Sequence, residues 1–434
     1  MIKNIIFMLK IFFVLSTELC IYFVFNDFPL FIERLTNKLA AINILYVKFF
    51  QAIALNNNLI DDNINNKLIK FTDNAPWNYN DIRYEELITI ANDFNILLPF
   101  GYEKPINAGM ISLVFKGYKK DTNEPVIIKV KRKNINKQLD ESIDNLLFFI
   151  KTLSFIPFIK KYRINEVVAK NIDIIKQQTD FRIEVNNMIK MKKNCKNLKY
   201  VEIPYVYKEV TEANPNIIVM EFIKGETIKN VKEEDYEEFA KQVLKFGFVT
   251  TLIHGVAHGD LHSGNILFIK DDAHDKYKHK IGVIDFGIIY ELNENYKNQM
   301  LDMIASDVFT TPCDLTARKI LYSGVLEPLS VIQNLDGYHV ENIVSILANV
   351  IKECVTIKKK ASQTQLYNFF TKLTNYLNKN DISNLGLKPS DDLVKSQLVL
   401  AMSHGVSLSL CKSDFAAVAN KVLNELFHTE LLDE

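Results

Sequence analysis

The sequence predicts an α+β fold with two lobes, and three observations lead to that prediction. Apolar strand patterns at 105–117 and 125–130, separated by turn residues, are typical of a small β-rich lobe. An apolar run at 217–225 ends in glycine and indicates a buried strand, placed where a hinge would join the two lobes. Beyond it, residues 232–254 and 295–434 are predicted to be mostly helical.

A chain of 434 residues is too long for one ordinary domain, and four segments are expected. They are an apolar N-terminal helix that could anchor to a membrane (1–28), a helical extension (29–100), a β-rich N-lobe with inserted helices (101–224) and a mostly helical C-lobe (225–434).

Two spaced motifs assign a chemistry to this architecture. The first runs from His258 to Asn265 (HGDLHSGN), and the second is Asp285-Phe286-Gly287 after an apolar strand pattern. Kinase-type phosphoryl transfer needs an acid that orients the acceptor hydroxyl, and an amide and a second carboxylate that hold Mg²⁺ on the phosphates. Asp260, Asn265 and Asp285 have the order and spacing of those three groups. The expected core is therefore protein-kinase-like, with Asp260 catalytic and Asn265 and Asp285 as metal ligands.

Composition excludes several other classes. Hydrophobic residues make up 48% and charged residues 24%, which is enough apolar material for a core. Lys+Arg and Asp+Glu number 52 each, so nothing in the overall charge favours a nucleic-acid partner. The five cysteines are scattered without C-x-x-C pairs, which argues against a disulfide framework or a zinc site and favours a reducing, intracellular compartment.

Residues 4–25 are mostly apolar and as a helix would be roughly 31–33 Å long, about one bilayer thickness. Lys10 and Glu18 interrupt the run and are expected on the same broad side of the helix. A spanning anchor is disfavoured by these charges, and a signal peptide by the lack of a small-residue cleavage site. An amphipathic helix at the membrane interface, or one packed on the domain, fits best.

Three helices are expected in the extension, at 30–55, 61–72 and 82–94. Lys48 and Gln51 lie one turn apart on the otherwise apolar first helix, and without the kinase motifs they would be taken for the edge of a buried face.

The N-lobe contains the candidate nucleotide site. Residues 106–114 (INAGMISLV), here called the phosphate loop, are expected to cover the phosphates with backbone N–H groups. Lys129 matches the strand lysine that pairs with phosphates, and its expected partner is Glu184, on a long helical pattern through about 165–193. The backbone at Glu221 and Ile223 is expected to meet the adenine. The expected cofactor-binding residues are Ile106, Asn107, Ala108, Gly109, Met110, Ile111, Ser112, Leu113, Val114, Lys129, Glu221 and Ile223.

In the C-lobe, residues 266–284 are expected to form two short strands around a charged loop. His274 and His279 in that loop lack metal-ligand spacing. After Gly287 no A-P-E sequence follows, so the usual activation segment of protein kinases is missing.

Together these segments resemble the UbiB (AarF-domain) family of atypical kinases. Four segments have sequences similar to family motifs: Tyr46–Gln51 to the K-x-G-Q motif, the phosphate loop to an alanine-rich loop, Gln178–Asp180 with Glu184 to the E-x-D motif and its following helix glutamate, and Val219–Gly225 to the hinge. Phe50 replaces the glycine of the first motif, and Gln178 replaces the glutamate of the third.

The resemblance implies a helical extension folded over the active site, with Lys48 and Gln51 reaching the catalytic cleft. It also implies ATP and Mg²⁺ as cofactors, and a role in lipid, isoprenoid or quinone metabolism at a membrane. The leading hypothesis is an ATP/Mg-dependent atypical kinase or ATPase with an unknown phosphate acceptor. Two alternatives remain: a small-molecule kinase, which His258–His262 would also suit, and a nucleotide-binding pseudokinase scaffold.

Overall fold

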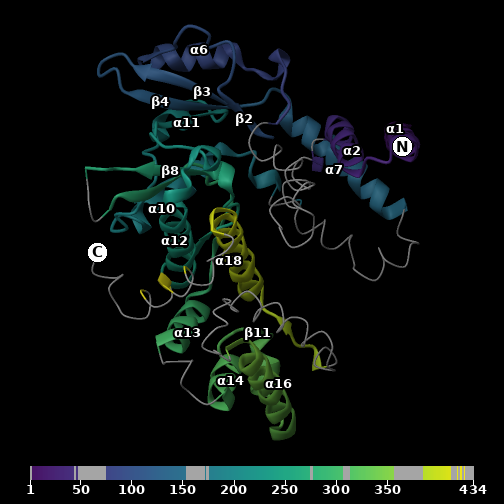
Figure 1. The fold of residues 1–434 in the computed structure, drawn as a ribbon, viewed down its shortest axis with the longest axis vertical. Helices are drawn as coiled ribbons and strands as arrows, with labels where there is room; N and C mark the ends of the chain where they lie inside the picture. Colours follow the sequence, from purple (N-terminus) through teal and green to yellow (C-terminus); the bar gives the residue numbers. More distant parts are fainter. Residues whose placement is uncertain are drawn as a thin grey trace. The chain divides into compact units, whose positions relative to one another are not determined.

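The computed structural model describes residues 2–43, 45–46, 75–152, 172, 175–273, 277–305, 313–355, 385–411, 418, 421–422 and 425. These residues form two compact units: residues 1–189, 204–223 and 285–288 in the first, and residues 190–203, 224–284 and 289–434 in the second. Each unit has its own β-strands (Figure 1). Each also has its own buried apolar residues. The predicted helix at 61–72 and the residues Lys48, Phe50 and Gln51 lie outside the described residues.

The first unit is built on a five-stranded antiparallel sheet with the order β1-β3-β4-β6, in which β2 also pairs with β3. Its strands are β1 (Ile96–Leu97), β2 (Asn107–Ala108), β3 (Ser112–Lys119), β4 (Pro125–Lys131) and β6 (Ile217–Glu221). The strands predicted at 105–117, 125–130 and 217–225 are therefore present, with small shifts at their ends.

One face of this sheet is covered by α6 (Tyr84–Asp93), which Figure 1 shows along β3 and β4. The strand β3 alternates, so that Leu113 and Phe115 point into the same apolar cluster as Leu87 and Ile90 of α6. Gly117 continues this inward row, and a Cβ there would come within 2.7 Å of Ile96, so the close approach of β1 requires glycine.

Two helices of the first unit, α1 (Ile2–Phe25) and α2 (Phe28–Ile42), come before the sheet in the chain. A third, α7 (Ile135–Thr152), follows β4. The expected helix at 30–55 ends as α2 at Ile42, where the Asn43 backbone N–H donates to the Leu39 carbonyl. Pro29 lies in the first turn of α2, where its missing N–H costs no helical hydrogen bond.

The two charged residues that interrupt the apolar run of α1, expected on the same broad side of the helix, differ in burial. Lys10 is exposed, whereas Glu18 is fully buried against α2 and forms ion pairs with Arg34 at 2.8 Å and Lys38 at 2.5 Å. The negative charge of Glu18, which interrupts the apolar run, is therefore neutralised by Arg34 and Lys38 of the next helix. Among the described helices, Lys3–Phe25 is long and apolar enough to cross a membrane, a test that core helices and signal sequences also pass.

The prediction of one continuous helix through about 165–193 is wrong, because a turn interrupts it. Gln178 and Thr179 form a turn, and α10 (Phe181–Asn194) begins only after Asp180, whose carboxylate accepts the Arg182 N–H at 3.1 Å. Thus Glu184 lies in the first turn of a new helix. Another helix in this unit, α11 (Lys208–Ala213), packs on β6.

The second unit contains a three-stranded sheet in the order β5-β9-β8 and a separate antiparallel pair, β7 with β10. These strands are β5 (Val201–Glu202), β7 (Val256–His258), β8 (Ile266–Lys270), β9 (His279–Val283) and β10 (Ile289–Glu291). The β8 and β9 strands are the two predicted around the charged loop at 266–284.

Helices make up most of the rest of the second unit: α12 (Tyr236–Phe248), α13 (Glu294–Ala305), α14 (Cys313–Leu321), α15 (Leu329–Gln333), α16 (Gly337–Val355) and α18 (Asp391–Leu410). Figure 1 shows α12 and α18 side by side, and Ser407 of α18 donates to the Ala240 carbonyl of α12 at 3.0 Å. A short strand pair, β11 (Leu326–Glu327) with β12 (Lys388–Pro389), was not predicted from the sequence.

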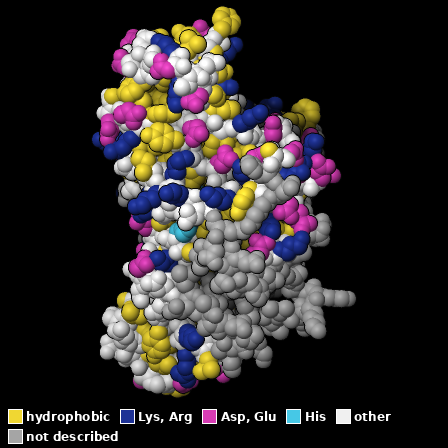
Figure 2. Space-filling view, turned by 90° about the vertical axis from the view of Figure 1, so that its left-hand side faces the viewer, with side chains coloured by type: hydrophobic (Ala, Val, Ile, Leu, Met, Phe, Trp, Pro, Cys, Tyr) yellow, Lys and Arg dark blue, Asp and Glu magenta, His cyan; other side chains and the backbone are white. Residues whose placement is uncertain are grey.

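The described surface mixes charge types. On the face shown in Figure 2, acidic and basic side chains lie among hydrophobic ones, consistent with 52 residues of each charge in the chain.

Candidate active site

A buried group of three charged side chains lies in the first unit. Lys129 on β4 places its Nζ 2.5 Å from Glu184 Oε1 on α10 and 2.9 Å from Asp285 Oδ2. Lys129 and Glu184 are each only 5% exposed, whereas about a third of the Asp285 side chain is open to solvent. Lys129 Nζ thus joins a residue 55 positions away and another 156 positions away, and only the fold brings them together.

In this ionic triad, burial and the charges of the neighbouring side chains shift the pKa values in opposite directions. Burial alone would lower the pKa of Lys129, but the charges of Asp285 and Glu184 outweigh it, and the net pKa is raised. Burial raises the pKa of Glu184, an effect that the Lys129 ammonium opposes and the Asp285 charge reinforces. The raised pKa of Lys129 favours a charged ammonium, whereas the raised pKa of Glu184 favours a neutral carboxylic acid, so the two shifts disagree about whether the pair is ionised. The ion-pair distances of 2.5 and 2.9 Å decide for a charged triad, because an unpaired ammonium at this depth would be far less stable.

The loop that carries Asp285 is held in place by its neighbours. Asp285 Oδ1 accepts the Gly287 N–H at 3.0 Å, and Asn187 Nδ2 donates to the Phe286 carbonyl at 2.9 Å. Sequence reasoning missed Asn187, although it lies three residues after Glu184 and therefore on the same face of α10. The second oxygen of Asp285, Oδ2, points to Lys129.

Gln178 provides a test of whether a metal ion would fit here. Its Oε1 is buried and has no hydrogen-bond partner among the described residues. A Cβ at Gly287 would meet both Asp285 Oδ1 and Gln178 Nε2 at 3.4 Å, so both side chains lie against this glycine. The atom of Gln178 next to Gly287 is the amide nitrogen, but the Asp285 carboxylate and the unsatisfied Gln178 Oε1 are each an oxygen donor of the kind that a hard divalent cation accepts. The residues present therefore fit Mg²⁺.

The phosphate loop is a tight hairpin between β2 and β3, in which the Gly109 N–H donates to the Ser112 carbonyl at 2.8 Å. Ala108, Met110 and Leu113 are buried, whereas Ile106 is exposed. At the other end of the sheet, the N–H of the exposed Glu221 donates to the Tyr205 carbonyl at 2.8 Å, and the Tyr205 N–H donates to the Glu221 carboxylate at 3.1 Å. Ile223 is buried.

The predicted catalytic loop belongs to the second unit. The Asn265 side-chain amide donates to the Asp260 carbonyl at 2.9 Å, and the Asp260 N–H donates to His258 Nδ1 at 3.2 Å. The Ile284 N–H, at the end of β9, donates to the Asn265 carbonyl at 3.1 Å. The pKa of Tyr290 is raised by burial and by the negative charge of Asp260, so the Asp260 carboxylate lies close enough to this tyrosine to act on it. Asp260 and Asn265 are thus fixed relative to each other by a short, internally bonded loop.

These residues fall inside a match to a known family. The ABC1 atypical kinase-like domain matches residues 95–312, which is half of the 434 residues. The chain belongs to the ABC1 atypical kinase-like family. This membership confirms the UbiB-type resemblance and, with the five-stranded sheet and the helical second unit, the two-lobed kinase-like α+β fold.

Curated relatives with related sequences include bacterial and plant proteins. The chain is 24% identical over 287 residues to the "Probable protein kinase UbiB" of Shewanella sp. (strain MR-4), covering 62% of this chain and 50% of that protein. It is 30% identical over 286 residues to an "Uncharacterized protein in hydrogenase 1 5'region" of Clostridium pasteurianum, covering 63% and 50%. It is 25% identical over 298 residues to "Protein ACTIVITY OF BC1 COMPLEX KINASE 1, chloroplastic" of Arabidopsis thaliana, covering 64% and 41%. The chain spans about half the length of the curated relatives it matches.

Solved structures with similar arrangements include a Mycobacterium tuberculosis protein in "The complex structure of Rv3197-erythromycin", with 15% sequence identity and a TM-score of 0.47, covering 81% of this chain and 83% of that chain. The Rio2 kinase of Chaetomium thermophilum, in a complex with ADP/Mg²⁺ and phosphoaspartate, has 12% identity and a TM-score of 0.27, covering 69% and 76%.

The family match covers some of the predicted site residues and not others. Lys129, Glu184, Asp260, Asn265 and Asp285 all lie within the matched ABC1 segment. Lys48 and Gln51 lie before it and outside the described residues, so their roles remain predictions from the sequence.

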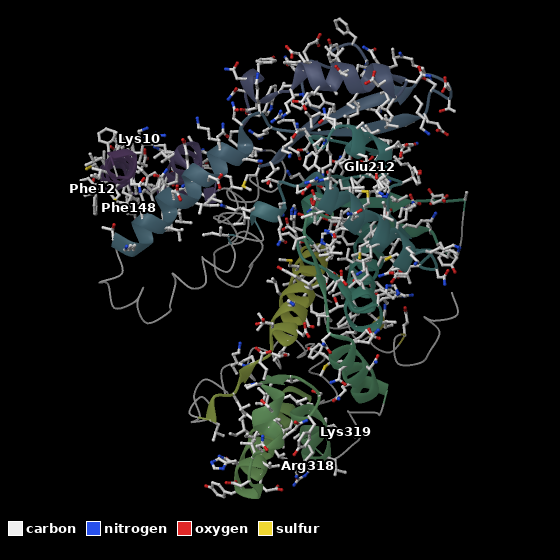
Figure 3. All side chains as sticks on the ribbon, turned by 180° about the vertical axis from the view of Figure 1, so that it is seen from behind. Lys10, Phe12, Phe148, Glu212, Arg318 and Lys319 are labelled. Carbon is white, nitrogen blue, oxygen red and sulfur yellow. The ribbon has the colours of Figure 1, made fainter. Side chains whose placement is uncertain are left out.

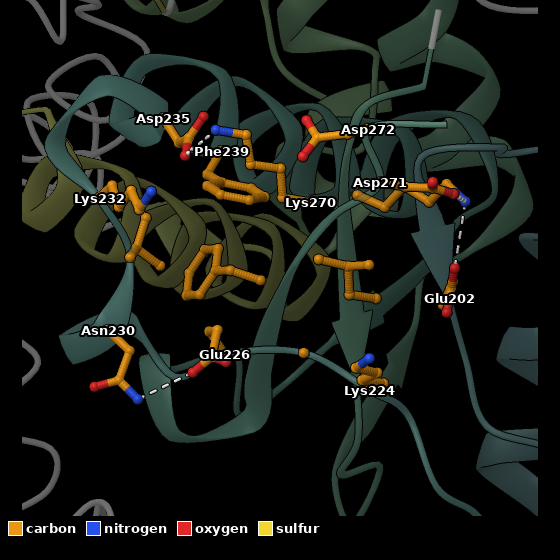
Figure 4. A pocket seen from close by; sticks show the side chains of 15 residues that line it. Glu202, Lys224, Glu226, Asn230, Lys232, Asp235, Phe239, Lys270, Asp271 and Asp272 are labelled. Atoms are coloured by element: carbon orange, nitrogen blue, oxygen red, sulfur yellow. Dashed lines mark hydrogen bonds and ion pairs between the residues drawn. The ribbon is translucent and has the colours of Figure 1, made fainter. Parts of the chain in front are cut away.

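A separate cavity of about 530 Å³ lies in the second unit, between β8, β9 and the start of α12. Figure 4 shows Phe239 in its wall and the Lys270 ammonium directed at Asp235, a contact of 2.8 Å. Asp235 also accepts from His279 at 2.7 Å, so His279 is bound to a carboxylate. Within the described residues no group of His, Cys, Asp and Glu is arranged to hold a metal ion by itself. Neither Asp260 nor Asn265 lines this cavity.

Proposed function

We propose that this protein is an ATP- and Mg²⁺-dependent atypical kinase or ATPase of the UbiB type. The observation that carries the proposal is the buried triad of Lys129, Glu184 and Asp285. Removing three charges from water is costly, and such arrangements are concentrated at functional sites. In kinases a strand lysine paired with a helix glutamate, together with the aspartate of D-F-G, assembles the phosphate and metal site. The ABC1 match supports the same assignment.

Each predicted residue has a defined task in this proposal. Lys129, oriented by Glu184, would pair with the phosphates of ATP, and Asp285 and Asn265 would hold Mg²⁺. Mg²⁺ when bound neutralises negative charge on the phosphates. Asp260 would accept the proton of the attacking hydroxyl or water, the task of the aspartate in the kinase catalytic loop.

Two features of the sheet complete the proposed nucleotide site. The backbone N–H groups of the phosphate loop would cover the phosphates, and the backbone of Glu221 and Ile223 would meet the adenine. Glu221 is the last residue of β6, and in this proposal the chain that follows it serves as the hinge.

The proposal is tested by following γ-labelled ATP with and without liposomes. An ATPase would release labelled phosphate, and a kinase would transfer the label to protein, lipid or a small molecule. Binding of ATP with neither outcome, in the presence of lipid, would identify a nucleotide-binding scaffold instead.

We further propose that α1 associates with a lipid surface. One side of α1 is occupied by the first unit: Phe7, Ile11 and Glu18 are buried, and Lys3 pairs with Glu141 of α7 at 3.0 Å. The other side exposes large apolar side chains, namely Ile5, Ile6, Leu9, Phe12, Phe13, Leu19, Phe23, Val24 and Phe25.

A helix with protein on one side and apolar side chains on the other suits the plane of a membrane interface better than a span, which lipid would surround on all sides. Figure 3 labels Lys10 and Phe12 on α1 and Phe148 on α7, a helix that α1 contacts. Exposed Lys10 could extend its ammonium to anionic headgroups while its methylenes remain in the apolar layer.

Replacing Phe12, Phe13 and Phe23 together with aspartate is expected to abolish flotation with anionic liposomes. These side chains are 70%, 71% and 80% exposed, so the substitutions leave the packed side of α1 intact. Each phenylalanine contributes about 1.5–3 kcal/mol when it leaves water, so the loss of three, about 4.5–9 kcal/mol, is similar to the whole affinity of a single acyl anchor, about 5.5 kcal/mol. Tyr338→Asp, at a 77% exposed aromatic residue on α16, is the control. Flotation of the triple variant equal to that of the parent would place the lipid contact elsewhere.

A further inference from the structure

A buried arginine connects the phosphate loop to the segment that precedes α6. Arg132 follows β4 directly and is 4% exposed. Its Nε and Nη2 both donate to the Gly109 carbonyl, at 3.0 and 2.7 Å. Its Nη1 donates to the Pro76 carbonyl at 2.8 Å and to Asp81 Oδ2 at 3.0 Å. One guanidinium thus binds the loop with one edge and residues of the helical extension with the other.

Two further backbone hydrogen bonds hold the same loop. The Arg132 N–H donates to the Ile111 carbonyl at 2.9 Å, and the Ala75 N–H donates to the Ala108 carbonyl at 2.7 Å. The carbonyls of Ala108, Gly109 and Ile111 are therefore all engaged by Arg132 or by the extension. Asp81 is itself fixed, because its carboxylate also accepts the Asn78 N–H at 3.0 Å.

Because the peptide unit is planar, fixing a carbonyl of the phosphate loop also fixes the direction of the N–H group of the next residue. In a planar trans peptide, the carbonyl of one residue and the N–H of the next point in opposite directions. Because the Gly109 carbonyl is turned towards Arg132, the Met110 N–H is turned away from it. Backbone N–H groups fixed in one direction are what a loop needs in order to bind phosphate oxygens.

We propose that Arg132 is a positioning residue for nucleotide phosphates: by holding the Gly109 carbonyl, it presets the Met110 N–H, and it ties the loop to residues 75–81 of the extension. This inference rests on the proposed nucleotide-binding function. Arginine is suited to the task because its planar fork reaches three separate acceptors at once. Asp81 provides the countercharge that a buried guanidinium requires.

The test is to measure dissociation constants for MgATP and for adenosine in the parent and in Arg132→Lys. Adenosine has no phosphates, so its affinity reports on the adenine end of the site alone. Arg132→Lys is expected to weaken MgATP binding roughly tenfold, as the loss of about one phosphate hydrogen bond implies, and to leave adenosine affinity unchanged.

A matched control is available just before α6, where an arginine contacts the same sheet. Arg83 is a half-buried arginine that donates to the Lys131 carbonyl at 3.0 Å and to Glu86 at 2.6 Å, without contacting the phosphate loop. Arg83→Lys is expected to change neither affinity. If Arg132→Lys fails to fold, Asp81→Asn carries the test, because it keeps a hydrogen-bond acceptor but removes the countercharge; it is expected to weaken MgATP selectively, by less than Arg132→Lys.

The possible results separate the inference from the proposed function. Unchanged MgATP affinity in the Arg132 or Asp81 variant would overturn the inference, and so would an equal loss for MgATP and adenosine, which would indicate a general structural role. Failure of the parent to bind MgATP would overturn the proposed function, and the inference with it. Selective loss for MgATP, with Arg83→Lys unaffected, would support both.

Discussion

Lys129→Met is expected to lose detectable MgATP binding and about 3–5 kcal/mol of folding free energy, because removing one partner of a buried ion pair leaves the other uncompensated. Here the uncompensated group is Glu184, which is 5% exposed. Urea unfolding followed by circular dichroism measures the stability, and calorimetric titration measures the binding.

A double variant distinguishes the charge effect from a packing effect. Lys129→Met/Glu184→Gln removes the stranded carboxylate and is expected to recover part of the stability but none of the MgATP binding. Lys116→Met on the neighbouring strand β3 is the control, since its ammonium lies over the Phe222 ring, 4.6 Å from the centroid, and pairs with neither carboxylate of the triad. Equal stability of Lys129→Met and the parent would show that no buried ion pair is present.

The contribution of Lys129 to the folding stability is expected to be lost at high pH and not at low pH. The folded-state pKa of Lys129 is raised above its unfolded value, so its stabilising contribution is fully present below the ordinary lysine pKa of about 10.4. The contribution is lost only as the pH rises through the raised folded-state pKa. The contribution of Lys129 to the stability of the parent, measured by urea unfolding at several pH values, should therefore stay constant across the neutral range.

The second large effect is expected at Asp260. Asp260→Asn should lower ATP turnover by about 10²–10⁴-fold, the usual contribution of a positioned acid–base group, while MgATP affinity stays within about twofold. The substitution keeps the backbone carbonyl of residue 260, which accepts from Asn265. Asp272→Asn, at an exposed aspartate in the same unit, is the control, and both variants should unfold at the parent's temperature. Unchanged turnover in Asp260→Asn would remove this residue from the mechanism.

The fold could be predicted from the sequence because its signals are local. Alternation in β3, the apolar runs of β4 and β6, and the fixed spacing of His258–Asn265 are each read within a few residues. Order along the chain then suggested Glu184 as the partner of Lys129, since a kinase-like sheet requires a helix glutamate in that place.

The parts that could not be predicted depend on contacts between distant residues. Periodicity placed Lys10 and Glu18 on the same broad side of α1, but it could not show that Glu18 is buried and paired with Arg34, 16 residues further along the chain. A helical pattern also hid the turn at Gln178. Arg132 belongs to no motif, and its acceptors lie 23 to 56 positions away, so nothing near it in the sequence indicates its role.

The central claim is that Asp285 and its neighbours bind nucleotide through Mg²⁺, and the most direct measurement is the stabilisation of the folded protein by ATP with Mg²⁺ or with EDTA. At an MgATP concentration 100 times the dissociation constant, the parent should gain about 2.7 kcal/mol of stability, and most of this gain should disappear with EDTA. Asp285→Asn should fold but show no difference between MgATP and ATP with EDTA, because a neutral amide cannot replace the carboxylate that holds the metal. Equal Mg²⁺-dependent stabilisation of Asp285→Asn and the parent would contradict the claim.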